Sequence, residues 1–329
     1  MKHIIFGGDG FLGTELTRML VERGESVLIC DEKQSLEFGN YDSDRASYLK
    51  MDVRDQATFE AITPETDDIV YHFAARLLVP ILPRKERQNY FWEALYVGTE
   101  NVLQWMEKNG LQKLVYYTTD MVYGHTVFNP RTEDHPCAPL GPYGEAKYQT
   151  EKLVDNYRAK GFSITLFRPR LIIGHGRLGI LEKLFKLIDW NLPVPTIGSG
   201  RNYYQFISVG DCSRACLAAV EAGLPNENYN LGSTEPPTVN ELLKDLINEA
   251  GSKSFLIPTP AFAVKAVLAS LDRMGKPIMD PEQYLIADET CILDCTKAER
   301  ELNWRAQDSD TSMLKVAYHD YKEGKSRPS

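Results

Sequence analysis

Short apolar runs alternate with amphipathic stretches through the first half of the chain. Runs of three to six residues, rich in valine, isoleucine, leucine, tyrosine and phenylalanine, predict strands at Lys2–Phe6, Ser26–Cys30, Tyr48–Lys50, Ile69–Phe73, Lys113–Thr118 and Ser163–Phe167. Apolar positions at helical spacing predict helices at Leu12–Arg23, Gln88–Asn109 and Tyr143–Lys160. Because strands that alternate with helices form β-α-β crossovers, the pattern predicts an α/β fold with a doubly wound parallel sheet.

The pattern changes after Arg168-Pro169. Prolines divide the rest of the chain into shorter segments, with one return to strand character at Tyr229–Leu231. We therefore predict a first domain over residues 1–170, with a returning segment near residues 203–231. The remaining residues, 171–329, are expected to form a smaller C-terminal lobe that binds the substrate.

Composition and charge narrow the functional classes. The net charge of -9 argues against a nucleic-acid partner, because proteins that bind phosphate backbones present a basic face. No apolar run has the length of a membrane span, and the short run after Met1 does not match a secretion signal. The six cysteines are dispersed and form no Cys-x-x-Cys motif, as expected of free thiols in a reducing compartment. We expect a cytoplasmic protein without membrane, nucleic-acid or metal partners.

A glycine-rich turn follows the first predicted strand. The segment Gly7-Gly8-Asp9-Gly10-Phe11-Leu12-Gly13 matches both Gly-x-Gly-x-x-Gly and Gly-x-x-Gly-x-x-Gly. A turn without side chains lets backbone N–H groups approach a pyrophosphate, and the N-terminus of the next helix stabilises its charge. A glycine triplet alone is a weak signal, but here a strand precedes it and a helix follows. The turn predicts a dinucleotide site with the pyrophosphate at residues 10–12.

The second predicted strand is followed at once by Asp31, which bears on the choice of cofactor. An acidic side chain at this position accepts hydrogen bonds from the adenosine ribose hydroxyls and repels a 2′-phosphate. Lys33 lies nearby and opposes that preference, since a cation can accommodate the phosphate. The sequence favours NAD over NADP; the alternative role for Asp31 is that of a solvated turn residue.

A tyrosine and a lysine begin the third predicted helix. Tyr143 and Lys147 are four residues apart and therefore lie one turn apart on the same helical face. An ammonium group lowers the pKa of a neighbouring phenol, so that the tyrosine can exchange a proton with a substrate hydroxyl. Thr119 follows the fifth strand and is placed to hydrogen-bond the same substrate oxygen. Tyr-x-x-x-Lys by itself is common in helices, and its weight comes from its position after the glycine turn and Thr119.

These residues, taken together, resemble the extended short-chain dehydrogenases/reductases, the group of nucleotide-sugar epimerases and dehydratases and of 3β-hydroxysteroid dehydrogenases. The resemblance implies a Rossmann-type domain with a smaller substrate lobe. Beyond the residues already named, it rests on Asp52-Val53, His72-Phe73-Ala74-Ala75, Gly98–Leu103, Thr118–Gly124, Arg168-Pro169, Phe206–Asp211 and Asp294-x-x-Lys297-Ala298-x-x-x-Leu302-x-Trp304. This set is specific for the group and much less specific for a substrate.

The resemblance also implies roles for individual residues. Tyr143 would be the acid/base, Lys147 would bind the nicotinamide ribose, and Thr119 would orient the substrate hydroxyl. Ordinary packing is the alternative for Ala74, Ala75 and Pro169. With the glycine turn and Asp31, the expected cofactor contacts are Gly7, Gly10, Phe11, Leu12, Gly13, Asp31, Asp52, Val53, Phe73, Ala74, Ala75, Tyr143, Lys147 and Pro169.

The chain departs from the group's pattern on the substrate side. Hexose 4,6-dehydratases typically show Thr-Asp-Glu where this chain has Thr119-Asp120-Met121, and a methionine cannot remove the C5 proton. Asp120 remains a candidate catalytic acid, with capping of the local turn as the alternative. Two usual anchors for a nucleotide diphosphate are replaced by Leu171 and Tyr204, so nearby arginines would have to bind the phosphates. The expected substrate contacts are Thr119, Asp120, Met121, Arg170, Leu171, Arg177, Arg201 and Tyr204.

Three functions are compatible with these residues. The first is an epimerase that uses NAD to oxidise and re-reduce a ring hydroxyl of a nucleotide sugar. The second is a net dehydrogenase or ketoreductase of a less polar secondary alcohol, which Leu171 and Tyr204 favour. The third is a non-catalytic NAD-binding scaffold, which the Thr119, Tyr143 and Lys147 set disfavours.

The predicted helix Gln88–Asn109 has more aromatic residues than are needed for the one helical face that packs on the sheet. Together with the resemblance, this surplus predicts a homodimer formed through this helix and Tyr143–Lys160.

Overall fold

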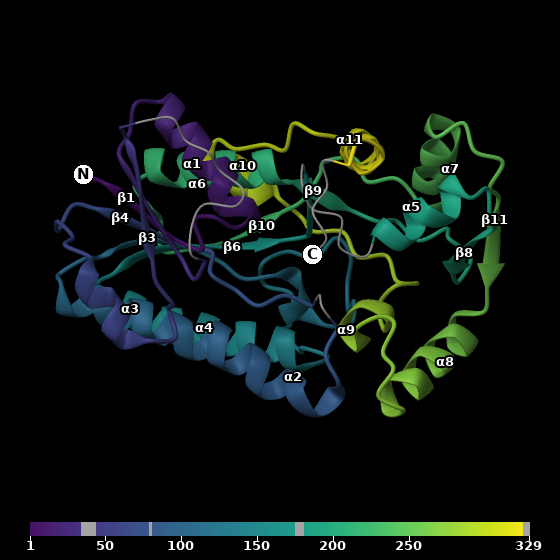
Figure 1. The fold of residues 1–329 in the computed structure, drawn as a ribbon, viewed down its shortest axis with the longest axis horizontal. Helices are drawn as coiled ribbons and strands as arrows, with labels where there is room; N and C mark the ends of the chain where they lie inside the picture. Colours follow the sequence, from purple (N-terminus) through teal and green to yellow (C-terminus); the bar gives the residue numbers. More distant parts are fainter. Residues whose placement is uncertain (34–43, 79–80, 175–180, 325–329) are drawn as a thin grey trace.

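The protein is described by a computed structural model that covers residues 1–33, 44–78, 81–174 and 181–324 (Figure 1). A seven-stranded sheet forms its centre, and all neighbouring strands are parallel. The chain begins near the middle of the sheet and winds outward in both directions, which confirms the doubly wound fold. In spatial order the strands are β10 (Asn228–Leu231), β6 (Ser163–Pro169), β5 (Lys113–Tyr117), β4 (Ile69–His72), β1 (His3–Phe6), β2 (Val27–Asp31) and β3 (Ala46–Lys50).

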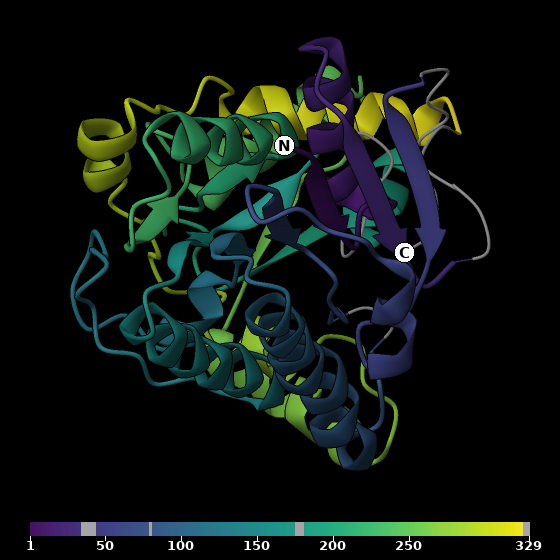
Figure 2. The ribbon, with the colours of Figure 1, turned by 90° about the vertical axis from the view of Figure 1, so that its left-hand side faces the viewer.

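The sheet separates two hydrophobic cores. Along β1, Ile4 and Phe6 belong to one core and Ile5 to the other, as alternation along a strand requires. Both faces are covered by helices (Figure 2), so the central strands are buried and read as continuous apolar runs. The core around Ile5 is covered by α1 (Phe11–Glu22), α6 (Val209–Glu221) and α10 (Thr296–Leu302), and the core around Ile4 and Phe6 by α3 (Gly98–Lys108) and α4 (Pro142–Ala159).

The helix expected at Gln88–Asn109 is longer and less regular than its sequence pattern indicates. It starts at Arg84 as α2 (Arg84–Phe91), passes through a π-helical segment, η2 (Trp92–Val97), and continues as α3. The wider π turn changes which side chains face inward. Leu95 packs against Tyr143 of α4, whereas Val102, one to two turns later, packs on the sheet. A pattern of constant helical period cannot express this change.

The C-terminal lobe has a hydrophobic core of its own. The expected returning segment, residues 203–231, is only partly in the main sheet: β10 joins it, but β9 (Phe206–Ser208) pairs with β7 (Leu171–Ile173). A second small sheet pairs β8 (Val194–Ile197) with β11 (Leu256–Thr259). No helix in the part of the chain that the structure describes is long and apolar enough to cross a membrane. The remaining elements are η1 (Gln56–Ala61), η3 (Asp120–Tyr123), α5 (Leu181–Asp189), α7 (Val239–Glu249), α8 (Ala261–Arg273), α9 (Pro281–Tyr284) and α11 (Asp310–Lys322).

Candidate active site

The glycine turn lies between β1 and α1 and is closely packed against backbone. Gly7 has a φ of +78°, and a Cβ placed on it would lie 2.5 Å from the backbone nitrogen of Ala74. A Cβ on Gly13 would lie 2.4 Å from the carbonyl oxygen of Gly7. Both neighbours are backbone atoms, which cannot move aside without moving β4 or β1. The turn therefore requires glycine at both positions.

The start of α1 is suited to an anion. Gly10 is its N-cap, no side chain caps it there, and its first turn contains no acidic residue. The helix dipole and the backbone N–H groups of such an end favour a phosphate. Leu12 turns into the core below, so its side chain does not cover this end of the helix. These features fit the pyrophosphate of a dinucleotide at residues 10–12.

Asp31 is the last residue of β2 and lies beside the glycine turn. One carboxylate oxygen accepts a hydrogen bond from the backbone N–H of Asp9 at 3.1 Å. Burial raises the pKa of this carboxyl above its ordinary value, and the charge of Lys33 opposes the rise. The Lys33 ammonium lies 3.5 Å from the carboxylate of Asp9. The cation is thus held against the turn by Asp9, next to the carboxylate of Asp31.

The other expected cofactor residues lie along the carboxyl ends of the neighbouring strands. Val53 is buried, and its carbonyl accepts a hydrogen bond from Asn101 at 2.9 Å. The carboxylate of Asp52 is paired with Arg54 at 2.6 Å. The backbone N–H groups of Phe73 and Ala74 both donate to the carbonyl of Phe6, which fixes this loop against the end of β1. Ala75 packs beside Tyr143. Pro169 is the buried last residue of β6.

Tyr143 and Lys147 lie on one face of α4, with Lys147 deeper. The Lys147 ammonium donates a hydrogen bond to the carbonyl of Tyr117 at 2.8 Å, and burial lowers its pKa to about 7. Tyr143 is buried to 8% exposure and packs edge-on against Phe91, with ring centroids 5.4 Å apart. Thr119, two residues after β5, is the N-cap of η3 and accepts the N–H of Met121 at 3.2 Å.

A buried hydrogen-bonded group lies beneath the lysine. His72 contacts the hydroxyl of Thr99 at 3.0 Å, and this hydroxyl is 3.2 Å from that of Tyr116. The Tyr116 ring lies 5.0 Å from the Lys147 ammonium. Burial, and secondarily the charge of Lys147, lower the pKa of His72 to about 3. The histidine is therefore neutral near pH 7, and Lys147, with a pKa of about 7, is the group of this set that carries a positive charge when protonated.

Asp120 does not stand alone in the cleft. Its carboxylate forms an ion pair with Arg170 at 2.5 Å, and both side chains are almost fully buried. The Arg170 guanidinium lies over the ring of Tyr204, 5.2 Å from its centroid, and its Nε atom is buried without a hydrogen-bond partner. Leu171 follows on β7 and packs in the core of the lobe. The structure thus brings together four of the expected substrate residues: Asp120, Arg170, Leu171 and Tyr204.

The remaining arginines are placed differently. Arg201 is exposed, and its backbone N–H is bonded to the hydroxyl of Ser199. Arg177 falls outside the described residues. Glu282 of α9 is a site residue that the sequence does not predict; its carboxylate accepts the backbone N–H groups of Tyr143 and Gly144. No local motif surrounds Glu282, so only its position in the fold connects it with α4.

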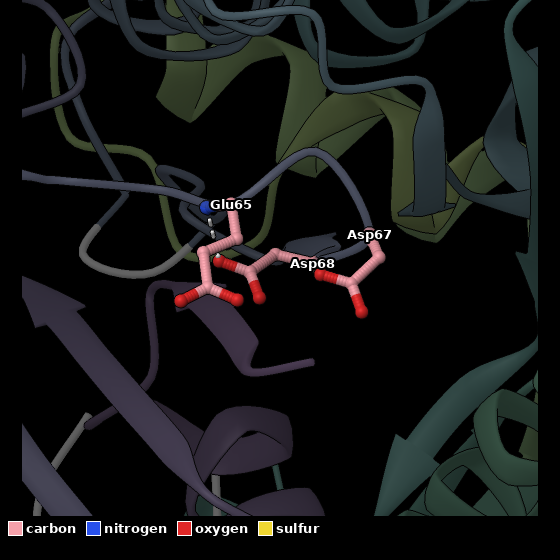
Figure 3. A group of neighbouring side chains, drawn as sticks. All are labelled: Glu65, Asp67 and Asp68. Carbon is pink, nitrogen blue, oxygen red and sulfur yellow. Dashed lines mark hydrogen bonds between the residues drawn. The ribbon is translucent and has the colours of Figure 1, made fainter.

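One group of acidic side chains lies outside this site. Among the residues that the structure describes, Glu65, Asp67 and Asp68 are close enough together to hold a cation (Figure 3). Asp68 already accepts the backbone N–H groups of Lys2 and Glu65, at 2.6 and 2.9 Å, and the terminal amine of Met1 lies 3.5 Å from Asp67. The group lies at the start of β4, at the end of the sheet opposite the glycine turn.

Comparison with known proteins places this geometry in a family. The model of the NAD dependent epimerase/dehydratase family matches residues 3–232. The chain belongs to this family. It is an NAD-dependent enzyme of the short-chain dehydrogenase/reductase type, and the glycine turn, Asp31 and the uncapped start of α1 fit that cofactor.

The matches to relatives and solved structures cover most of this chain. It is 30% identical over 259 residues to a putative UDP-glucose 4-epimerase of Methanocaldococcus jannaschii, a match that covers 75% of this chain and 82% of the relative. An uncharacterised protein of Sinorhizobium fredii is 28% identical over 322 residues, covering 97% of this chain and 78% of that protein. The structure of a UDP-glucose 4-epimerase with UDP-glucose from Thermotoga maritima gives a TM-score of 0.79 at 26% identity, covering 98% and 99% of the two chains.

Proposed function

We propose that this protein is a nucleotide-sugar epimerase that inverts one ring carbon through a transient ketone. The observation that carries the proposal is the pairing of Tyr143 with a buried Lys147 on one face of α4, near the carboxyl edge that holds the glycine turn. The relatives described above, whose names refer to UDP-glucose 4-epimerases, support the same class of substrate. NAD, when bound, supplies a nicotinamide ring that accepts and returns a hydride.

Tyr143 performs the proton transfer in this proposal. As a phenolate it accepts the proton of the ring hydroxyl while the hydride leaves the same carbon, which becomes a ketone. It returns the proton when the hydride is delivered to the other face of that ketone, so the reaction has no net oxidation. The Lys147 ammonium, one helical turn away, favours the phenolate, and Thr119 orients the substrate oxygen.

Polar groups on the substrate side favour a charged substrate over an apolar one. Arg170 keeps an unpartnered Nε within the cluster around Tyr204, although Asp120 neutralises part of its charge. We propose that Arg170 and the exposed Arg201 bind the diphosphate, since burying phosphates unpaired is very costly; Arg177 is a further candidate outside the described residues. Met121 lacks a basic atom, so elimination by the usual dehydratase route is not expected.

A net dehydrogenase of a less polar alcohol is the second candidate. Leu171 and Tyr204, which replace an amide and a cation, favour it. The two candidates differ in one measurable product. An epimerase supplied with NAD and UDP-glucose or UDP-galactose interconverts the two sugars without accumulating NADH. A dehydrogenase accumulates NADH with secondary alcohols and interconverts neither sugar.

Replacing Tyr143 by Phe tests the mechanism under either candidate. Only the ionisable oxygen is lost, so we expect kcat to fall roughly 100-fold or more while NAD affinity stays unchanged. Product formation and NAD titration on the same sample measure the two effects. Near-normal turnover by Tyr143→Phe would exclude Tyr143 as the acid/base. If the wild-type protein and the variant were equally inactive toward every substrate, the non-catalytic scaffold would be favoured.

We also propose that the enzyme works as a homodimer in the cytoplasm. Tyr90, Trp92 and Tyr96 remain only partly buried on the helix that runs from α2 to α3, beside α4. Aromatic side chains of this kind commonly fill interfaces. All six cysteines are free thiols, which suits a reducing compartment. A monomeric mass by light scattering at micromolar concentration would exclude the dimer.

A further inference from the structure

The helix that carries Tyr143 is capped by a residue from a distant segment. α4 begins at Pro142, and its N-cap, Gly141, provides no side-chain hydrogen bond. The first two available N–H groups, those of Tyr143 and Gly144, donate instead to the two carboxylate oxygens of Glu282, each at 2.8 Å. Glu282 belongs to α9 in the C-terminal part of the chain, 139 residues beyond Tyr143. A single carboxylate thus binds the backbone of Tyr143 from outside the Rossmann-type domain.

The sequence on both sides leaves room for this contact. A Cβ on Gly141 would lie 2.6 Å from one Glu282 oxygen, and a Cβ on Gly144 would lie 2.8 Å from the other. The glycines on either side of Pro142-Tyr143 therefore keep this position open for the carboxylate. Glu282 is 1% exposed, and its own backbone N–H is fixed by Asp280 at 3.0 Å.

A buried charge network holds Asp280 and Glu282 against the helices. Arg87 of α2 lies 3.6 Å from the Asp280 carboxylate and 2.5 Å from that of Asp272 on α8. A cavity of about 430 Å³ adjoins Glu282 and is bounded by residues of α2, α4, α8 and α9. The network gives the carboxylate a fixed position, and the cavity gives it space in which protons and water can be exchanged.

We infer that Glu282 is a positioning residue for Tyr143: by accepting the N–H groups of Tyr143 and Gly144 it fixes the backbone from which the phenol projects. The inference rests on the proposed function, because it assigns Tyr143 as the acid/base. Misplacing a reacting group by about 1 Å can cost roughly 100-fold in rate, so a fixed helix start matters for turnover. The carboxylate also stabilises the positive end of the α4 dipole.

Glu282 is suited to change its charge near neutral pH. Burial raises its pKa to about 7, and the charge of Asp280 adds to the rise. The N–H groups of Tyr143 and Gly144 oppose it, as does the charge of Arg87. Above neutral pH the group accepts both N–H bonds. Below it, one oxygen carries a proton and accepts more weakly, so one of the two bonds is weakened.

The test compares Glu282→Gln with the wild-type holoenzyme. An amide has one accepting oxygen, so this variant keeps one of the two N–H bonds and no charge. We expect kcat to fall roughly 10-fold, KM for the nucleotide sugar to change less than about twofold, and the acid limb of the kcat profile to move to lower pH. Hydrogen exchange of the peptide containing the Tyr143 and Gly144 amides should become faster. After correction for the intrinsic, base-catalysed rate, its protection should no longer change near pH 7.

Glu289→Gln is the matched control. Glu289 also lies late in the chain and accepts a backbone N–H, that of Thr126, but it does not contact α4. The Glu289→Gln variant should have the wild-type kcat and the wild-type hydrogen-exchange rate of the peptide that contains Tyr143. If Glu282→Gln behaves like this control, the inference is wrong.

A second substitution covers the case in which Glu282→Gln fails to fold. Glu282→Asp keeps the charge but is shorter by one methylene, so it should lower kcat with a smaller shift of the pH profile. Wild-type kcat and wild-type amide exchange in that variant would overturn the inference. A wild-type enzyme that epimerises no nucleotide sugar would contradict the proposed function, whereas the exchange measurement still decides whether Glu282 fixes Tyr143.

Discussion

At the cofactor end of the candidate site, the decisive contacts are between backbone atoms around one short turn; at the proposed substrate end, they are made by charged side chains from distant segments. The glycine turn, residues 7–13, brings Gly13 against Gly7 with no space for a Cβ. The substrate end instead joins Asp120 to Arg170, 50 residues later, and Tyr143 to Glu282, 139 residues later. The first arrangement depends on the absence of side chains in the turn, and the second on buried charged side chains whose partners lie far away in the sequence.

The largest effect is expected where one member of a buried charge pair is removed. Arg170→Leu leaves the Asp120 carboxylate buried and unpaired, which should lower the free energy of unfolding by about 3–5 kcal/mol. The double variant Asp120→Ala/Arg170→Leu removes both charges and should recover most of that loss. Urea unfolding of the three proteins measures both effects. A single variant within about 1 kcal/mol of wild type would show that the pair is not effectively buried.

The same double variant separates stability from substrate binding. It lacks the guanidinium over Tyr204 although its fold is restored. If Arg170 binds the diphosphate as proposed, KM for a nucleotide sugar should rise at least tenfold, corresponding to about 1.4 kcal/mol, with a smaller change in kcat. An unchanged KM would assign Arg170 to stability alone and leave the phosphates to other cations.

A smaller effect is expected at the cofactor end. Gly13→Ala places a methyl group against backbone atoms that cannot rotate away, which should cost about 1–3 kcal/mol of stability and displace the start of α1. NAD affinity, measured by calorimetric titration, should therefore fall more than kcat does. Gly210→Ala is the control, because the nearest atom to its new methyl group is the flexible end of Arg214, at 3.3 Å. Equal NAD affinity in both variants would contradict the close packing of the turn.

The contrast between the two ends also decides what the sequence can predict. The strand positions, the glycine turn, Asp31 and the Tyr143–Lys147 pair follow from local patterns, because periodicity and turn chemistry act over a few residues. The partners of Asp120 and Tyr143 depend on how the lobe folds back over the sheet. Nothing near Glu282 in the sequence distinguishes it from other acidic residues of the chain. The π-helical segment was not predicted either, because it interrupts the 3.6-residue periodicity on which the prediction of a helix relies.

The smallest effect concerns acid stability and arises in the core between the two ends. His72 is neutral in the folded protein because burial, aided by the charge of Lys147, lowers its pKa to about 3 from an ordinary value near 6.5. As the pH falls below the ordinary value, the unfolded chain takes up a proton that the folded one does not, so stability declines until the folded pKa is reached. This single group should lower the free energy of unfolding by about 1.2 kcal/mol at about pH 5.5 relative to pH 7. His72→Gln should remove that part of the slope, whereas replacement of the exposed His125 should leave most of it. Urea unfolding at a series of pH values compares the slopes, and an unchanged slope in His72→Gln would mean that the histidine is protonated in the native state.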